Sequence, residues 1–377
     1  MKPLQHQASC PIHRPHPAAS SPVRRVWHHL ASRIVLSLGL ALSAPALVAS
    51  DLEHPSEYLK ASEFPGGVAG GDVDNWRDKV PQAELIEIDS SADGSSQSAF
   101  FYDSGSDEEK PLLIVLHSWS IDYTQNIDIP FAQFAVANDW VFIHPDFRGA
   151  NDGNPDTTAS DKVISDMQDA LEYARENASV DSSRIYVLGY SGGAMNALHL
   201  ASRNPDVFAG VAAWVPVYDL PDWYQWNASR GEKYAEEIAE ACGGVPESGS
   251  AAHDECQQRS PSSHADDLKG QMPILLAHGI HDDTVPPSHA LKAFNDLVEE
   301  DDRIAESVIE ELMQSREIPS ALRERAQNDE ANMPGFAAAN ADIELYLRSG
   351  DIELVLFDGD HDMLYRPGLD WLNRQQR

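Results

Sequence analysis

The chain has 377 residues, of which 42% are hydrophobic, so it is long enough to bury the core of one large α/β domain. It holds 61 acidic and 27 basic residues, which gives a formal net charge of −34 at pH 7. Such a surface repels nucleic acid and anionic lipid, so the composition excludes nucleic acid as a partner.

The first 50 residues have the pattern of a secretory signal peptide. They contain basic residues and no acidic residue, then an apolar run over 34–42 and small residues around 44–49. This run is too short for stable insertion into a membrane, although an uncleaved anchor remains the alternative. We expect cleavage near residue 50 and export to the periplasm or the cell exterior.

Three cysteines are present, and Cys10 lies within the expected signal peptide. Cys242 and Cys256 remain, and in an oxidising compartment we expect them to form a disulfide; two free thiols are the alternative. Neither cysteine has the spacing of a metal ligand and the sequence has no zinc pattern, so we expect no metal. The serine chemistry predicted below needs no organic cofactor either.

Residues 51–82 are predicted to be a loose N-terminal arm before a domain that covers 83–377. Two strands at 83–89 and 98–103, joined by a Gly/Ser/Asp-rich turn, open this domain. Buried strands are then predicted at 111–117, 140–145, 184–190, 208–217, 273–279 and 352–361. Helical patterns stand between them at 131–138, 160–178, 194–202 and near 288–299. This alternation predicts an α/β fold with a mostly parallel, doubly wound sheet and an antiparallel edge.

Two stretches interrupt the alternation of strand and helix. Residues 221–268 carry Trp223, Tyr224, Trp226 and the two cysteines but little strand pattern, and residues 301–348 read as helical with a break at Pro319. Insertions of this size near strand ends often form lids over an active site. Simple surface elaboration is the alternative reading for both.

Ser191 lies in the sequence "GYSGG" at 189–193, a G-x-S-x-G motif between a predicted strand and a predicted helix. In this position the motif forms a nucleophile elbow, a sharp turn that exposes the serine hydroxyl above the sheet. Gly189 and Gly193 have no Cβ atom, so the strand and the helix can approach each other around the turn. We therefore expect Ser191 to be a nucleophile.

A serine nucleophile needs a base and an acid that orients the base. "HGIHDDTVPP" at 278–287 follows an apolar strand and offers Asp282 and Asp283, and "FDGDHDM" at 357–363 follows the last strand and offers His361. The chain order of serine, acid and histidine is the order this kind of elbow requires. We expect His361 to be the general base and an aspartate to hold it.

An oxyanion hole is the other requirement for acyl transfer. One donor is expected to be the N–H of Gly192, directly after the serine, and the second a backbone N–H in "HSWS" at 117–120. We assign the second donor to Trp119, with Ser118 as the neighbouring alternative.

Together these motifs give residues 110–377 a resemblance to the α/β-hydrolase fold. Within that fold the chain resembles the catalytic domain of prolyl oligopeptidase-type serine peptidases and related esterases. The resemblance rests on "DFRGANDG" at 146–153, on "GYSGG", on the run at 259–290 that contains "HGIHDDTVP", and on "DGDH" at 358–361. It implies that Asp282, and not Asp283, is the acid of a Ser191–Asp282–His361 triad.

The chain departs from the family pattern at several points. About sixty residues precede the hydrolase region after the expected signal peptide, whereas the peptidases usually carry a large β-propeller there. "HSWS" replaces the family's Tyr-Gly-Gly type of oxyanion segment, and the glutamates that bind a peptide's amino terminus in some members have no match. These departures favour an esterase over a peptidase.

The leading prediction is therefore an exported serine hydrolase that forms an acyl-enzyme on small or polysaccharide-linked esters, such as acetyl or feruloyl esters. A prolyl oligopeptidase-type serine peptidase is the alternative, and a non-catalytic binding module is a third reading. Aromatic and polar side chains are candidates for substrate binding, with core packing as the other explanation for each. These candidates are Ser118, Tyr190, Trp214, Trp223 and Trp226.

Overall fold

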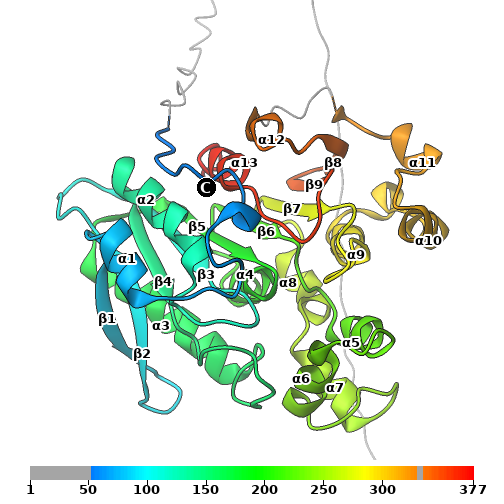
Figure 1. Ribbon diagram of the computed structural model, residues 1–377, viewed down its shortest axis with the longest axis horizontal. Coiled ribbons are helices and arrows are strands. Elements are labelled where there is room, and N and C mark those ends of the chain that lie inside the picture. Colours follow the sequence, from blue (N-terminus) through cyan, green and yellow to red (C-terminus); the bar gives the residue numbers. More distant parts are fainter. Residues whose placement is uncertain (1–51, 329–333) are drawn as a thin grey trace, which may run out of the picture. The chain divides into compact units, whose positions relative to one another are not determined.

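A computed structural model of the protein describes residues 52–328 and 334–377 (Figure 1). The predicted signal peptide, Cys10 included, lies outside these residues. Within the described part, no helix has the length and apolar character needed to cross a bilayer. The same part of the chain has no group of three or more His, Cys, Asp or Glu side chains placed to hold a metal ion.

The core of the molecule is one nine-stranded sheet with the strand order β1-β2-β4-β3-β5-β6-β7-β9-β8. The strands are β1 (Glu84–Asp89), β2 (Ser96–Tyr102), β3 (Lys110–Leu116), β4 (Val141–Pro145), β5 (Val180–Tyr190), β6 (Gly210–Trp214), β7 (Ile274–Gly279), β8 (Ile343–Ser349) and β9 (Ile352–Phe357). In this spatial order, every neighbouring pair from β4 through β3, β5, β6 and β7 to β9 is parallel. At the two edges, β1, β2 and β8 pair antiparallel with their neighbours. The predicted doubly wound sheet with an antiparallel opening edge is confirmed.

Helices cover both faces of the sheet. They are α1 (Val73–Lys79), α2 (Ile129–Ala137), α3 (Asp161–Asn177), α4 (Gly192–Arg203), α5 (Leu220–Ala228), α6 (Lys233–Ala241), α7 (Ala251–Gln258), α8 (Ala265–Leu268), α9 (Ser288–Leu297), α10 (Glu306–Ser315), α11 (Ser320–Arg323), α12 (Pro334–Ala338) and α13 (Tyr365–Leu372). One core cluster packs α3, α4, α8 and α9 against the sheet, and a second packs α1, α2, α12 and α13 against the other face. Alternate residues of each buried strand therefore enter different cores.

The strand order brings the ends of β5, β7 and β9 to one region of the sheet's carboxyl edge. Only β6 stands between β5 and β7, and β9 is the next strand after β7. Parallel strands place their carboxyl ends at one edge, where open α/β sheets bind ligands. Residues that follow these three strands are therefore neighbours in space although they are far apart in sequence.

The arm over 51–82 was predicted to be loose, but its described residues pack against the body of the domain. The backbone of Lys60 forms an isolated antiparallel β-bridge with that of Leu364, and Gly71 forms another with Gln125. Trp76 of α1 is fully buried, and its ring stacks on Phe100 with centroids 4.3 Å apart. Buried aromatic area and backbone pairing hold this polar, Gly-rich segment in place, which local composition does not reveal.

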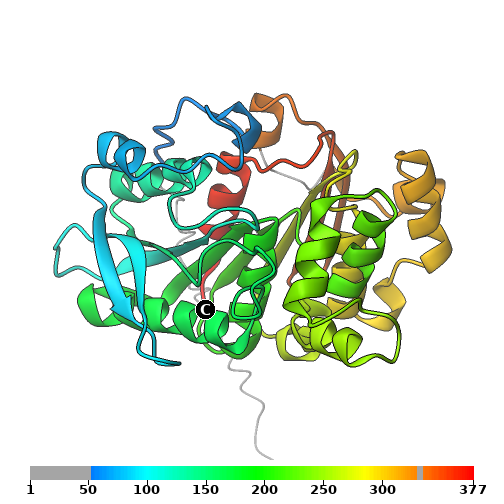
Figure 2. The ribbon, with the colours of Figure 1, turned by 60° about the horizontal axis from the view of Figure 1, so that its bottom comes forward.

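The two insertions differ in how they join the fold. Helices α5, α6 and α7 stand together as a group (Figure 2) around a small apolar core that they share with residues of the main domain, such as Trp119 and Val285. The second insertion was predicted as helical with a break at Pro319 and a second short helix, but its last part, β8, is an edge strand that pairs antiparallel with β9. Gly350, at a φ of 58°, turns the chain between these two strands. A glycine turn between two apolar runs is a sequence signal for a β-hairpin, and the prediction of helix over 301–348 did not take it into account.

Candidate active site

Ser191 occupies a sharp turn between β5 and α4, with a φ of 56° and a ψ of −119°. This is a strained conformation for a residue with a side chain. The turn depends on its glycines: a Cβ on Gly189 would lie 2.2 Å from the carbonyl carbon of Gly193, and one on Gly193 would lie 2.0 Å from the carbonyl oxygen of Leu116. The structure therefore has the predicted elbow, and close backbone approach explains both glycines.

The three residues predicted as a triad meet above the carboxyl edge of the sheet. His361 Nε2 lies 3.0 Å from Ser191 Oγ, and His361 Nδ1 lies 2.6 Å from Asp282 Oδ2. Both distances are within hydrogen-bond range, and the imidazole stands between the hydroxyl and the carboxylate. This is the arrangement in which a histidine can take the serine proton while the carboxylate holds its ring.

Asp282 is fully buried, and four polar groups contact its carboxylate. Oδ1 accepts the backbone N–H groups of Thr284 and Val285 at 2.8 and 2.9 Å, while Oδ2 faces His361 and lies 3.2 Å from His278 Nε2. Burial alone would raise the pKa of this carboxyl. The charge of His361 and the hydrogen bonds from both histidines outweigh burial, so the pKa of Asp282 lies well below its usual range. The side chain is therefore an anion at neutral pH.

The proposed oxyanion donors lie next to each other. A Cβ added to Gly192 would lie 2.8 Å from the Trp119 backbone nitrogen, so the two backbones are in close contact. Within residues 52–328 and 334–377, the Trp119 N–H has no hydrogen-bond acceptor. The N–H of the neighbouring alternative, Ser118, is occupied, because it donates to Gln125 Oε1 at 2.7 Å. The geometry thus favours Trp119 as the second donor.

A cavity of about 530 Å³ opens over Ser191 and His361. Its wall is formed by Val68, Ala69, Ser118, Trp119, Ser120, Tyr190, Ser191, Lys233, Tyr234, Thr284 and His361. Two of the predicted substrate-binding residues, Ser118 and Tyr190, are in this wall. The Tyr190 hydroxyl also donates to the His361 carbonyl at 3.0 Å, so this side chain supports the histidine loop.

The three tryptophans predicted to bind substrate are not in the cavity wall. Trp214 is fully buried and packs against Phe336 and Phe357, in the core between the sheet and helices α1, α2, α12 and α13. The indoles of Trp223 and Trp226 instead donate to the carbonyls of Thr284 and Asp283. Aromatic composition does not tell which face of an element a ring occupies, so the sequence could not place these three rings.

Sequence reasoning missed the cavity residues that the arm and α6 supply. Val68 and Ala69 come from the Gly-rich stretch 66–71 of the arm, and Lys233 and Tyr234 begin α6. Lys233 Nζ contacts Ser120 Oγ at 3.0 Å and Glu237 Oε1 at 2.8 Å. No motif marks these residues, and only the packing of the arm and of the first insertion brings them to the site.

Glu237 also supports the Trp119 side chain. Its Oε2 accepts the indole N–H of Trp119 at 2.8 Å, and the Trp119 ring packs edge-on against Trp223 with centroids 4.8 Å apart. The first insertion therefore fixes the orientation of the residue that we assign to the oxyanion hole. The indole bond leaves the backbone N–H of Trp119 available to a substrate in the cavity.

Comparison with known proteins agrees with this geometry. Residues 131–312, which include Ser191 and Asp282, match the model of the prolyl oligopeptidase family. Over these residues the chain is similar to the catalytic domain of that family. The described structure has the α/β-hydrolase fold with the triad geometry of a serine hydrolase, as the sequence motifs predicted.

The curated relatives of this hydrolase are longer proteins. It is 28% identical to acylamino-acid-releasing enzyme 2 of Oryza sativa subsp. japonica over 226 residues, which is 54% of this chain and 28% of the relative. It is 26% identical to poly(3-hydroxyalkanoate) depolymerase C of Paucimonas lemoignei over 117 residues, or 29% of this chain and 28% of that relative. The alignments thus span less than a third of each relative.

Solved structures similar to the hydrolase include two peptidases. Acylaminoacyl peptidase of Pyrococcus horikoshii matches 57% of this chain and 34% of its own, with 14% identity and a TM-score of 0.45. Prolyl oligopeptidase B of Galerina marginata matches 57% of this chain and 31% of its own, with 18% identity and a TM-score of 0.46.

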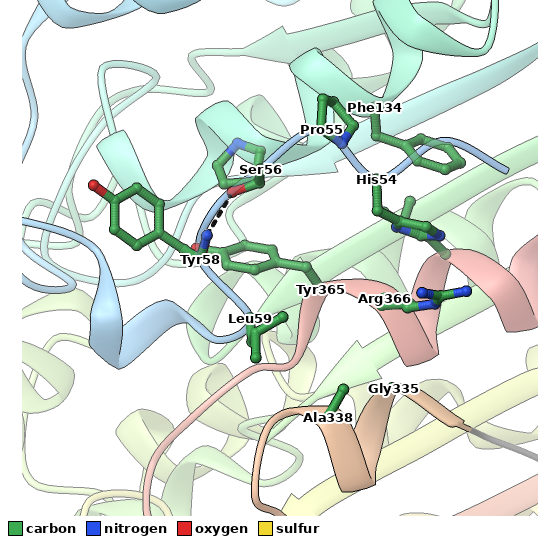
Figure 3. Close-up of a pocket in the computed structure, with 12 residues that line it drawn as sticks. His54, Pro55, Ser56, Tyr58, Leu59, Phe134, Gly335, Ala338, Tyr365 and Arg366 are labelled. Carbon is green, nitrogen blue, oxygen red and sulfur yellow. Dashed lines mark hydrogen bonds between the residues drawn. The ribbon is translucent and has the colours of Figure 1, made fainter.

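A second cavity in the hydrolase, of about 130 Å³, lies away from the triad, between the arm, α2, α12 and α13 (Figure 3). Three of the residues that line it have polar groups engaged with neighbouring protein groups. His54 Nε2 contacts Asp370 Oδ1 at 2.9 Å, the Ser56 hydroxyl accepts the Tyr58 N–H, and the Tyr365 hydroxyl donates to the Ile127 carbonyl.

The predicted disulfide between Cys242 and Cys256 is present in the hydrolase, and it joins the end of α6 to α7. The two cysteines are 14 positions apart, and closing a loop of this length restricts the unfolded chain by about 3 kcal/mol. We expect the double substitution Cys242→Ala/Cys256→Ala to lower the free energy of unfolding by that amount in urea titrations. A reductant should destabilise the wild-type enzyme but leave the variant unchanged; equal sensitivity of the two would contradict a structural role for the bond.

A buried histidine makes the hydrolase sensitive to acid. The Nδ1 atom of His289 accepts the Tyr218 N–H at 3.0 Å, and burial lowers the pKa of this histidine from 6.5 to about 3. Between pH 6.5 and 3 the unfolded chain therefore binds a proton that the folded protein excludes. Stability is fully present above pH 6.5 and falls by about 1.4 kcal/mol per pH unit below it on account of this one group.

The His289→Asn variant tests this pH dependence. An asparagine carbonyl can take the place of Nδ1 as the acceptor from Tyr218, but it does not titrate. We expect the urea unfolding free energy of the variant to fall between about pH 6 and 5 less steeply than that of wild type, by about 1.4 kcal/mol. Identical slopes would show that His289 binds its proton in the folded state.

Proposed function

We propose that the protein is a serine peptidase of the prolyl oligopeptidase type that hydrolyses an acyl bond in short peptides through an acyl-enzyme on Ser191. The observation that carries this proposal is the position of the His361 ring, between Ser191 Oγ and the buried Asp282 carboxylate, at the floor of a cavity. An anionic Asp282 favours the tautomer in which Nδ1 carries the proton, so Nε2 is free to accept.

Acylation follows from this arrangement. Ser191 Oγ attacks the substrate carbonyl while its proton moves to His361 Nε2, and the resulting imidazolium is stabilised by the Asp282 carboxylate. The bond to the leaving group then breaks, and the leaving amine takes the proton from Nε2. The products of this half-reaction are the free amine and an ester between Ser191 and the acyl group.

Deacylation repeats these steps with water as the nucleophile. His361 Nε2 takes a proton from water, the hydroxide adds to the ester carbonyl, and Ser191 leaves with that proton. In both tetrahedral intermediates the negative oxygen would be held by the N–H groups of Gly192 and Trp119. The strained turn at Ser191 is consistent with a hydroxyl held in place before the substrate arrives.

Three observations support peptide substrates. The family model that matches residues 131–312 is that of the prolyl oligopeptidase family, and the rice relative is named an acylamino-acid-releasing enzyme. A cavity of about 530 Å³ is within the range that takes ligands of a few residues. We therefore propose short or N-acylated peptides as substrates in preference to folded proteins.

A carboxylic-ester hydrolase is the second candidate, because an esterase uses the same triad and oxyanion hole. The match to a poly(3-hydroxyalkanoate) depolymerase favours it, since that relative is named for a polyester. Small or polysaccharide-linked acetyl and feruloyl esters would be the substrates in this case.

A substrate panel on the purified protein separates the two candidates. It compares N-acetyl-alanyl and prolyl p-nitroanilides with p-nitrophenyl acetate and methyl ferulate, and the Ser191→Ala variant supplies the blank. For a peptidase we expect kcat/KM for one of the anilides to reach about 10⁴ M⁻¹s⁻¹, the lower end of the range for enzymes on their own substrates. Turnover of esters without detectable turnover of any anilide would reject the peptidase proposal in favour of the esterase.

We also propose that the enzyme is exported. The basic and apolar pattern of residues 1–50 supports this, and so does the Cys242–Cys256 disulfide, because such bonds persist in oxidising compartments. Expression of the full chain in a bacterial host, followed by fractionation and N-terminal sequencing, should find a mature protein that begins near residue 51. A full-length protein retained in the cytosol would contradict this proposal.

A further inference from the structure

The loop that carries Asp282 is held from outside by side chains of both insertions. We call residues 280–285, between β7 and α9, the acid loop. Its backbone N–H groups at 280 and 281 donate to the carbonyls of Phe357 and Gly359, which ties it to the histidine loop. Among the residues that the structure describes, its carbonyl groups do not bond to the histidine loop. Five of them instead accept hydrogen bonds from side chains.

Arg316 supplies two of these hydrogen bonds. It follows the last residue of α10 in the second insertion, in a left-handed conformation with a φ of 54°. Its Nη1 donates to the carbonyls of Ile280 and Asp282, each at 3.1 Å, and its Nη2 contacts Asp283 Oδ1 at 2.8 Å. One planar guanidinium thus spans the acid loop on both sides of the catalytic carboxylate.

The first insertion supplies two more hydrogen bonds. Trp226 Nε1 donates to the Asp283 carbonyl at 2.9 Å, and Trp223 Nε1 donates to the Thr284 carbonyl at 2.8 Å. The Arg230 guanidinium lies 3.2 Å from the centre of the Trp226 ring, and that of Arg316 lies 5.8 Å from it. The two insertions therefore meet at the acid loop.

From this geometry we infer that Arg316 and Trp226 are positioning residues, which hold the acid loop so that the Asp282 carboxylate meets His361 Nδ1. This inference rests on the proposed role of the triad. It gives the second insertion a function in catalysis although none of the described residues of 301–348 lines the cavity. The carbonyl groups of a loop have no strand partner, so without these donors water would replace them and the loop would sample other conformations.

The reaction is sensitive to such movement. The bond between His361 Nδ1 and Asp282 Oδ2 is 2.6 Å long, and a displacement of about 1 Å in a catalytic group can cost about 100-fold in rate. We expect Arg316→Ala to lower kcat about 10- to 100-fold with little change in KM, because no cavity contact is lost. Arg316→Lys keeps the charge, but its single nitrogen cannot reproduce the planar, two-nitrogen contact with the carbonyls and with Asp283 Oδ1, so it should restore only part of the rate. Trp226→Phe, which removes the N–H donor but keeps a smaller aromatic ring, should cost less than Arg316→Ala.

A matched control comes from the same insertion. Arg325 donates to the carbonyls of Asp302 and Arg303, which are far along the chain from the acid loop. Arg325→Ala therefore removes a similar pair of arginine–carbonyl bonds within the insertion. We expect it to keep wild-type kcat, even if its melting temperature falls as far as that of Arg316→Ala.

A double-mutant cycle tests whether Arg316 acts through Asp282. In the Asp282→Asn background the carboxylate is already lost, so Arg316→Ala should slow the reaction less than about threefold further, although it costs about 10- to 100-fold in wild type. The acidic limb of the pH profile should also move to lower pH in Arg316→Ala, because a displaced carboxylate stabilises the imidazolium less. The same rate loss in both backgrounds, or a loss of equal size in Arg325→Ala, would overturn the inference.

The measurement is the rate of labelling by a fluorophosphonate probe at Ser191, confirmed with p-nitrophenyl acetate turnover. Labelling requires an activated serine but no particular natural substrate. If the peptidase proposal fails in the substrate panel, this test still applies. If wild type is not labelled at all, the triad proposal fails and the inference fails with it.

Discussion

Replacement of Ser191 by alanine is expected to abolish hydrolysis, with kcat lowered by about 10⁴- to 10⁶-fold. The hydroxyl is the group placed to form the acyl-enzyme, 3.0 Å from His361 Nε2. What activity remains would come from the oxyanion donors and from substrate binding, which the substitution leaves in place. Kinetics on the best substrate of the panel, together with intact-mass detection of fluorophosphonate labelling, measure this effect.

The fold should survive this substitution. An alanine side chain fits the same backbone turn, and within the described part of the chain the hydroxyl bonds only to the histidine. The melting temperature should therefore stay close to that of wild type. Ser165→Ala, on the exposed side of α3, is a suitable control that should keep full activity. Labelling that persists on the Ser191→Ala variant would show that another residue is the nucleophile.

Asp282→Asn is expected to lower kcat about 10⁴-fold while leaving the loop intact. The amide oxygen would keep the place of Oδ1, because the N–H groups of Thr284 and Val285 both donate there. The amide NH₂ must then face His361 Nδ1, which becomes an acceptor, and the ring proton moves to Nε2. A histidine in that tautomer cannot accept the Ser191 proton.

Asp283→Asn is the matched control, since the neighbouring aspartate has the same chemistry but a side chain 83% exposed. Its amide oxygen can still accept from Arg316, so we expect less than about a threefold change in kcat. The pair of variants decides between the two aspartates of "HDD". A larger loss in Asp283→Asn than in Asp282→Asn would contradict the proposed triad.

The triad was predictable because each of its residues follows a strand that the sequence marks clearly. Apolar runs before Ser191, Asp282 and His361 indicate buried parallel strands, and a parallel sheet gathers their carboxyl ends. The resemblance to a family then separated Asp282 from Asp283. The close approach of Gly193 to Leu116 gives the physical reason for the elbow motif.

The cavity walls were not predictable in the same way. Val68 and Lys233 reach the site only through the packing of the arm and of α6, and no motif in either segment points to the site. The tryptophans show the opposite problem. Trp223 and Trp226 are conspicuous in the sequence, and they do act at the site, but through indole N–H groups that hold the acid loop. Composition therefore points to these tryptophans but does not show that their indole nitrogens, and not their ring faces, act at the site.

The arm also sets a boundary for any shortened or tagged form of this enzyme. It pairs with the chain directly after His361: Ala61 donates to the Met363 carbonyl, and the Ser62 hydroxyl and N–H both donate to Asp362. A recombinant form that starts at β1 would keep the whole sheet. It would lose the hydrogen bonds that hold residues 362–363 next to His361, and it would lose Val68 and Ala69 from the cavity wall. Cloning designs for this enzyme should therefore begin upstream of Leu59, and an affinity tag belongs before that point or at the other terminus.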